Sequence, residues 1–179
     1  MEGQKEVEKN WVMFEDAAGN LKIVYNWHDL VIGDCIPNTE GGYTFAKTHT
    51  IKTPAIFKYF RGSTNGILIG DEIWFICHVV SYEDRRYYYH SIFTLDATTY
   101  EVRRFTPLLT FEGDKVEYTL GFVYREDGTA LEKSANDSGG TRYRIENADE
   151  DGTFWIGYSK MDNSTHYMAI RKSVVEGLM

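Results

Sequence analysis

The sequence predicts an all-β protein, on three observations. Aromatic residues make up 15% of the 179 residues, and such residues favour pleated, half-buried surfaces. Short apolar runs alternate with turn signals along the chain, and only three prolines occur. Only two segments have a helical pattern, a turn near residues 54–59 and the tail 173–178, and neither has a long amphipathic period.

The first group of expected strands lies within residues 11–47. Residues 21–25 alternate apolar and polar side chains, which is the period of a half-buried strand. Ala18-Gly19-Asn20 before them is a turn signal. The other expected strands of this group are 11–14, 30–35 and 43–47.

The second group begins after the small-residue loop at 61–65. Its central segment, residues 73–80, is almost continuously apolar, as expected for a strand that is buried on both faces. The neighbouring expected strands are 66–69, 86–95 and 102–105.

The third group is interrupted by a long polar segment. Residues 125–152 are rich in Gly, Asp and Asn, so we expect an excursion from the sheet there. The expected strands of this group are 116–124, 153–159 and 167–170.

The groups start about fifty residues apart, which matches the repeat of propeller blades and favours a partial β-propeller with a short C-terminal helix. A β-sandwich remains open, because it also has short strands and frequent turns. Either way we expect about three antiparallel sheets packed face to face. The expected divisions are a flexible N-terminus (1–8), one β domain (9–172) and a tail (173–179). The large side chains expected in contacts between sheets are Trp74, Phe75, Ile76, Leu120, Phe122, Trp155 and Ile156.

Composition excludes several classes of partner. The net charge is −8, from 27 acidic and 19 basic residues, which disfavours a nucleic-acid partner. No apolar run is long enough for a membrane span, and the polar start lacks the apolar stretch of a signal peptide. Cys35 and Cys77 are too few for a disulfide scaffold, which fits a reducing, cytoplasmic compartment.

Recognisable cofactor and metal motifs are absent from the sequence. There is no HExxH, Cys-x-x-Cys, nucleophile elbow or glycine-rich dinucleotide fingerprint, so we expect neither metal nor cofactor. The five histidines, at positions 28, 49, 78, 90 and 166, are spread along the chain.

Three segments carry groups capable of chemistry. His78, inside the apolar run, is either a core histidine with backbone hydrogen bonds or a residue that points into a central channel. Residues 85–90, Arg-Arg-Tyr-Tyr-Tyr-His, form either an edge strand or a row of anion-binding and stacking groups. Residues 61–66 form a loop with one basic group, Arg61, and glycines that allow close approach to a ligand.

Two carboxylates stand in otherwise apolar strands. Glu117 and Asp162 would suit glycoside hydrolysis, which uses one acid and one base or nucleophile. The alternative is that each caps a strand end or accepts backbone hydrogen bonds.

Several of these segments together resemble a group of five-bladed β-propellers related to the β-mannoside phosphorylases and mannosidases. Members of this group occur beside glycosyltransferases in bacteria and in large DNA viruses. The resemblance covers roughly residues 8–175. The segments that carry it are 8–11, 23–27, 60–66, 74–78, 86–90, 116–118 with 120–121, and 158–159 with Asp162.

The resemblance implies a sugar-facing funnel at the propeller axis. It also implies a glycan partner, phosphate as a second ligand, and a location in the cytoplasm, the cytoplasm of a host cell or a virion. The residues that match the family's phosphate side are Lys9, Asn10, Arg61, His78, Tyr88 and His90. The function expected is therefore hydrolysis, phosphorolysis or transfer at glycosidic bonds, and the alternative is a non-catalytic glycan-binding or assembly module.

The chain departs from the family in its number of blades. Five blades need about 250–300 residues at about 50 each, and this chain holds about three. It corresponds to the C-terminal part of such a propeller, without the early blades that carry the family's catalytic acid. We therefore expect a fragment, an inactive relative, or a chain that pairs with itself or with another protein.

Overall fold

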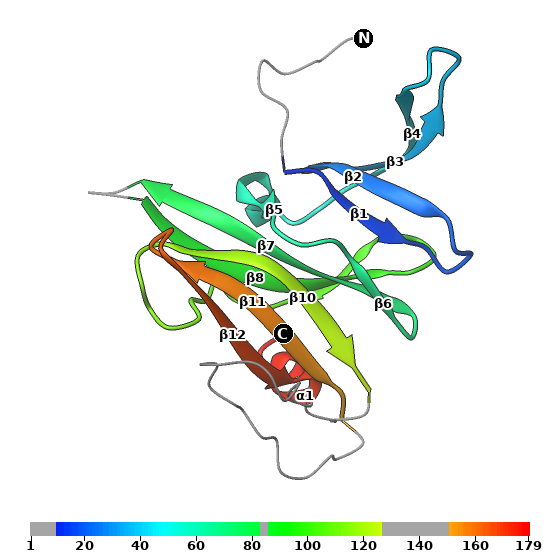
Figure 1. The fold of residues 1–179 in the computed structure, drawn as a ribbon. Helices are drawn as coiled ribbons and strands as arrows, with labels where there is room; N and C mark the ends of the chain where they lie inside the picture. Colours follow the sequence, from blue (N-terminus) through cyan, green and yellow to red (C-terminus); the bar gives the residue numbers. More distant parts are fainter. Residues whose placement is uncertain (1–9, 83–85, 127–150) are drawn as a thin grey trace, which may run out of the picture.

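The computed structural model describes residues 10–82, 86–126 and 151–179 (Figure 1). The predicted flexible N-terminus, Lys9 and residues 127–150 of the predicted excursion lie outside the described residues. All three sheets are antiparallel, which confirms the all-β prediction. The described strands form no closed barrel.

Sheet 1 is a four-stranded meander in chain order. Because each strand is joined to the next by a short turn, consecutive strands pair as neighbours. Its strands are β1 (Val12–Glu15), β2 (Leu21–Trp27), β3 (Leu30–Pro37) and β4 (Tyr43–Ile51).

Sheet 2 lies in the middle of the molecule and contains the two longest strands, β7 and β8 (Figure 1). The short strands β5 and β6 both pair with β7, and β9 pairs with β8. Its strands are β5 (Arg61–Gly62), β6 (Ile67–Ile69), β7 (Glu72–Tyr82), β8 (Arg86–Asp96) and β9 (Val102–Phe105).

Sheet 3 and two five-residue helices complete the described fold. The 3₁₀ helix η1 (Ala55–Tyr59) precedes β5, and α1 (Lys172–Glu176) follows the last strand. The strands of sheet 3 are β10 (Glu117–Arg125), β11 (Thr153–Lys160) and β12 (Ser164–Arg171). None of the helices in the described ranges has the length and apolar character needed to cross a membrane.

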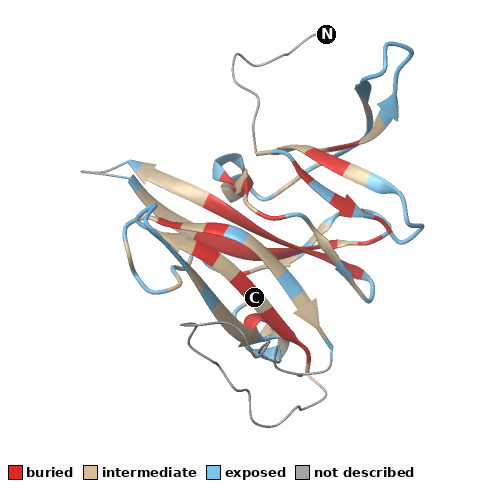
Figure 2. Cartoon of the chain, viewed as in Figure 1, coloured by how far each residue is buried: buried red, intermediate tan, exposed pale blue. Residues whose placement is uncertain are grey.

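Two apolar cores join the three sheets, one on each face of sheet 2 (Figure 2). Alternation along β7 explains this: Ile73 and Phe75 point into the core shared with sheet 1, whereas Trp74 and Ile76 point into the core shared with sheet 3. The continuous apolar run therefore reflects burial on both faces, as the sequence predicted.

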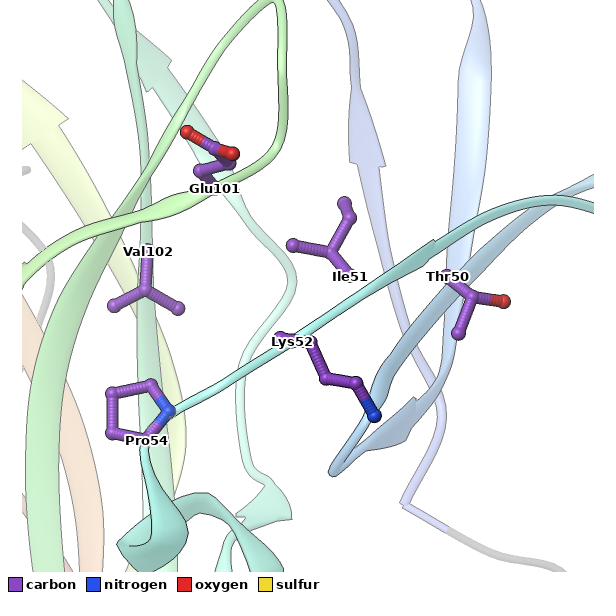
Figure 3. A pocket seen from close by; sticks show the side chains of 6 residues that line it. All are labelled: Thr50, Ile51, Lys52, Pro54, Glu101 and Val102. Carbon is purple, nitrogen blue, oxygen red and sulfur yellow. The ribbon is translucent and has the colours of Figure 1, made fainter.

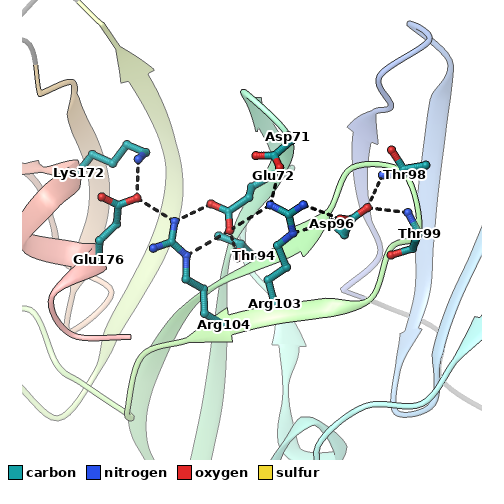
Figure 4. A network of polar contacts seen from close by, with 10 residues as sticks. All are labelled: Asp71, Glu72, Thr94, Asp96, Thr98, Thr99, Arg103, Arg104, Lys172 and Glu176. Carbon is teal, nitrogen blue, oxygen red and sulfur yellow. Dashed lines mark hydrogen bonds and ion pairs between the residues drawn. The ribbon is translucent and has the colours of Figure 1, made fainter.

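An ionic network ties sheet 2 to α1 (Figure 4). The guanidinium of Arg104 donates to both carboxylate oxygens of Glu72, at 3.1 and 2.6 Å, and to Glu176 at 2.8 Å. Val175 on the same short helix is fully buried in the core between sheets 2 and 3. The helix is therefore fixed by one apolar anchor and one shared guanidinium.

The predicted burial of Leu120 is wrong. Its side chain is 54% exposed, because the register between β10 and β11 shifts between Thr119 and Gly121 and leaves Leu120 as the extra residue of a β-bulge. Trp155 is only half-buried, since it alternates with the buried Phe154 and Ile156 and so lies on the outer face of sheet 3.

Candidate functional site

Strand register places three of the predicted site residues in one row across sheet 2. Arg61 on β5 lies opposite His78 on β7, and His78 lies opposite His90 on β8. Residues directly opposite each other in an antiparallel pair share a face. His90 contacts β10 of sheet 3, so the whole row faces sheet 3.

The loop after β5 divides its residues between the two faces of sheet 2. A Cβ on Gly62 would lie 2.4 Å from the side chain of Val12, so glycine here lets β1 approach closely. The Asn65 side chain accepts a hydrogen bond from the Met13 backbone N–H at 3.0 Å. These residues join sheet 2 to sheet 1, whereas Ser63 turns to the other face.

Asn10 lies beside this loop through its backbone. A Cβ on Gly62 would also meet the Asn10 carbonyl oxygen at 2.5 Å, and Asn10 has a left-handed backbone with φ of 63°. The Asn10 backbone therefore lies against Gly62, the residue after Arg61.

His78 is surrounded by groups from three strands and the loop. Its Nδ1 lies 2.8 Å from the Ser63 hydroxyl, and its side chain is nearly buried, with the residue 3% exposed. The ring centroids of Tyr88 and Tyr118 lie 5.6 and 5.2 Å from that of His78. Burial, and then the neighbouring Tyr88, raises the pKa of Tyr118, so its phenol keeps its proton and can donate a hydrogen bond.

We call this group the His78 cluster: Arg61, Ser63, His78, Tyr88 and Tyr118. All its members except His78 are partly exposed. The cluster thus combines a planar cation with two amphipathic aromatic rings.

His90 lies deeper than the His78 cluster and joins sheet 2 to sheet 3. Its Nε2 lies 3.1 Å from the Glu117 carbonyl oxygen, and its Nδ1 lies 3.1 Å from the Thr119 hydroxyl. The ring stacks on Phe111 with 4.3 Å between centroids. Burial lowers the pKa of His90 to about 4, so it is neutral near pH 7, with Nε2–H donating to the carbonyl and Nδ1 accepting from Thr119.

The carboxylate of Glu117 holds the loop between β9 and β10. It is fully buried and accepts hydrogen bonds from the backbone N–H groups of Phe111, Glu112 and Asp114, at 2.6, 2.8 and 2.9 Å. Both oxygens are therefore engaged with the protein's own backbone, which matches the structural alternative stated for this residue.

Asp162 lies in the exposed turn between β11 and β12, where it and Met161 both have positive φ. The turn adjoins the start of β10, because the Met161 N–H donates to the Val116 carbonyl oxygen at 2.8 Å, but in the described ranges no hydrogen bond or ion pair joins the Asp162 side chain to the Glu117 carboxylate. The structure thus brings Arg61, His78, Tyr88, His90 and Glu117 to the junction of sheets 2 and 3, and leaves Asp162 in a hairpin turn.

A charged group that the sequence did not single out lies beside this loop. Lys160 pairs with Glu112 and Asp114, both at 2.6 Å, and these carboxylates raise the pKa of Lys160. Tyr158 donates a hydrogen bond to Glu112. The two carboxylates lie more than forty residues from Tyr158 and Lys160 in the sequence, so no local pattern could have shown these contacts.

A shallow depression lies on the other side of sheet 2 (Figure 3). It has a volume of about 440 Å³ and is lined by residues of the chain at 50–54 and 101–102. Its cation, Lys52, pairs with Asp29 at 2.6 Å, and no predicted site residue lines it. Among the described residues, no group of three or more His, Cys, Asp or Glu side chains could hold a metal ion.

Comparison with known proteins supports the fold alone. No family model and no curated protein matches the chain. A solved structure described as a hypothetical protein from Leishmania major is similar, with a TM-score of 0.51 and 13% sequence identity. The match covers 91% of this chain and 51% of that one, so the chain spans about half the length of that protein.

Proposed function

We propose that the chain is a glycan-binding domain whose ligand contacts the His78 cluster, and that its three sheets are consecutive blades of a β-propeller. The observation that carries the proposal is the convergence of Arg61, His78, Tyr88 and Tyr118 at one half-exposed junction.

The order of the sheets supports the propeller. Sheets 1, 2 and 3 follow one another along the chain, each antiparallel, and sheet 2 is covered by its sequence neighbours on both faces. Propellers repeat such sheets around an axis, with each blade packed on the next.

The chemistry of the His78 cluster suits a sugar. A tyrosine ring offers an apolar face and a polar tip, which match the C–H face and the hydroxyl edge of a pyranose ring. The guanidinium of Arg61 supplies several donors in a fixed plane, for sugar hydroxyls or for a phosphate. The Ser63 hydroxyl, 2.8 Å from His78 Nδ1, helps to fix the orientation of the imidazole ring.

Binding is favoured over hydrolysis because of how the two predicted catalytic carboxylates are placed. The carboxylate of Glu117 already accepts three backbone hydrogen bonds, and Asp162 lies in an exposed turn. Glycoside hydrolysis most often uses two carboxyl groups that flank the bond to be broken.

The test is calorimetric titration of the full chain with β-1,4-mannobiose, and separately with inorganic phosphate. Arg61→Ala and Tyr88→Ala should each weaken sugar binding by about tenfold or more, the loss expected for one good polar or stacking contact. Lys58→Ala is the matched control, because Lys58 is an exposed cation on η1. Equal affinity in the parent and in both site variants would refute the assignment.

Catalysis is tested on the same preparation by following release of mannose. Asp162→Asn separates a catalytic from a binding role, and Glu117→Gln does so when its circular dichroism spectrum shows that the variant is folded under the assay conditions. Turnover that is abolished by both substitutions would replace the binding proposal with a hydrolase.

A further inference from the structure

Sheet 1 presents an apolar face to solvent, on the side away from sheet 2. Along β1 and β2, Val12, Phe14 and Val24 point into the core, so the alternating residues point outward. The outer face of sheet 1 is made up of Trp11, Met13, Glu15, Leu21, Tyr25, Phe45 and Lys47, with Ile23 on the same side but already buried.

An antiparallel sheet with one solvated face normally has polar residues on that face. Here Trp11, Met13 and Leu21 are 47%, 42% and 56% exposed. Trp11 packs on Tyr25, with 5.4 Å between centroids, and Tyr25 stacks on Phe45 at 5.0 Å. Contiguous exposed apolar side chains of this kind are typical of interaction surfaces.

A single glycine shows how closely this face is packed. A Cβ on Gly33 would lie 2.6 Å from the ring of Phe45, so the ring lies directly over the backbone of β3. The aromatic row therefore has a fixed position on the sheet, and it offers a preformed surface to a partner.

Two charged residues lie at opposite edges of the outer face. Glu15 is on β1 and Lys47 on β4, and neither has an ion-pair partner among the described residues. Met13, Ile23, Gly33 and Lys47 are paired in one row across the four strands. Lys47 is therefore level with Met13, which is two residues along β1 from Glu15. The offset along the strands is about 7 Å, which a lysine side chain can span once another copy places its Lys47 over β1.

From this arrangement we propose that the outer face of sheet 1 is the interface of a two-fold symmetric dimer of this chain. A two-fold axis parallel to the strands places β1 of one copy over β4 of the other. Glu15 of each copy then faces Lys47 of the other. The same pair of opposite charges therefore occurs two times, as in any isologous interface.

The exposed area is adequate for such a contact. Trp11, Met13 and Leu21 are about half exposed and Tyr25 and Phe45 are less so. A large side chain has about 150–250 Å² to bury when it is fully exposed, so these residues together with Glu15 and Lys47 leave on the order of 500 Å² open per copy. The pair would bury on the order of 1,000 Å², the lower range of specific interfaces, so we expect a reversible dimer in the micromolar range.

The test is sedimentation equilibrium of the full chain up to roughly 100 μM, a range that covers interfaces of this size. Glu15→Lys and Lys47→Glu should each weaken the dimer about tenfold, and the double substitution should restore it to within about threefold. Met13→Glu should give monomer, with an unchanged circular dichroism spectrum and unfolding midpoint showing that the chain still folds.

Tyr167→Glu is the matched control, because Tyr167 is 63% exposed on sheet 3 and should not affect the dimer. A parent chain that stays monomeric would overturn the proposal. An open series of oligomers would also overturn it, since that result indicates sheet 1 stacking on sheet 3 of the next copy. Single and double charge reversals with equal effects would exclude the Glu15–Lys47 pairing. This inference does not depend on glycan binding.

Discussion

The neutral, buried His90 predicts a specific loss of stability in mild acid. An unfolded histidine has a pKa near 6.5, whereas burial holds His90 at about 4. The unfolded chain therefore takes up a proton as the pH falls through 6.5, and the folded chain does not until the pH approaches 4. The contribution of His90 to the free energy of unfolding is therefore fully present above pH 6.5 and is lost as the pH falls from 6.5 to 4.

The size of this effect follows from the difference in pKa. A difference of about 2.5 units corresponds to about 3 kcal/mol in total, at 1.36 kcal/mol per unit. About 2 kcal/mol of this should already be lost between pH 7 and pH 5. That is a large part of the stability of a typical domain.

The assay is urea unfolding of the parent and of His90→Gln at pH 7, 6, 5 and 4.5. Glutamine retains a donor and an acceptor but does not titrate, so the variant should be less stable at pH 7 and should lack the His90 part of the acid loss. Carboxylates titrate in both proteins and cancel in the difference. His49→Gln, on the exposed part of β4, is the control for a histidine-to-glutamine substitution as such. Parallel curves for the parent and His90→Gln would refute this reasoning.

Three further substitutions and one control, each measured by urea unfolding, test the packing of the loops and strands. Glu117→Gln places an amide donor against a backbone N–H of the 111–114 loop and should cost about 1–3 kcal/mol; an unchanged stability would remove its anchoring role. Gly62→Ala should cost about 1–3 kcal/mol, because its Cβ meets a backbone oxygen at 2.5 Å, whereas Gly121→Ala, with open space, should cost much less; equal costs would contradict the close-approach argument. Leu120→Ser should change stability by less than about 0.5 kcal/mol, and a larger loss would show that the bulge residue is packed.

The sequence was enough to predict most strands, because the alternation of apolar and polar side chains and the turn residues between strands are local signals. The run around Trp74 correctly indicated a strand covered on both faces, since no polar alternation was present. Leu120 could not be placed, because a bulge inverts the alternation and depends on the partner strand β11. The arrangement of sheets into blades was suggested by spacing and stays a prediction.

Residue type and strand membership indicated part of the candidate site. Arg61, His78 and His90 lie in one row because adjacent strands pair in register, which the sequence does not state. Ser63 and Tyr118 were not selected, since their roles depend on which way a loop turns and on contact between two sheets. A carboxylate in an apolar strand, Glu117, has the same sequence signal whether it is catalytic or binds backbone N–H groups.

The central claim is that a sugar binds at the His78 cluster, and the most direct measurement is NMR titration of the full chain with β-1,4-mannobiose. We expect the NMR signals of the His78 imidazole and of the Tyr88 and Tyr118 rings to shift and to saturate at the same sugar concentration, while the signals of the buried His90 ring change little. Saturable shifts confined to other residues, or none at millimolar sugar, would contradict it.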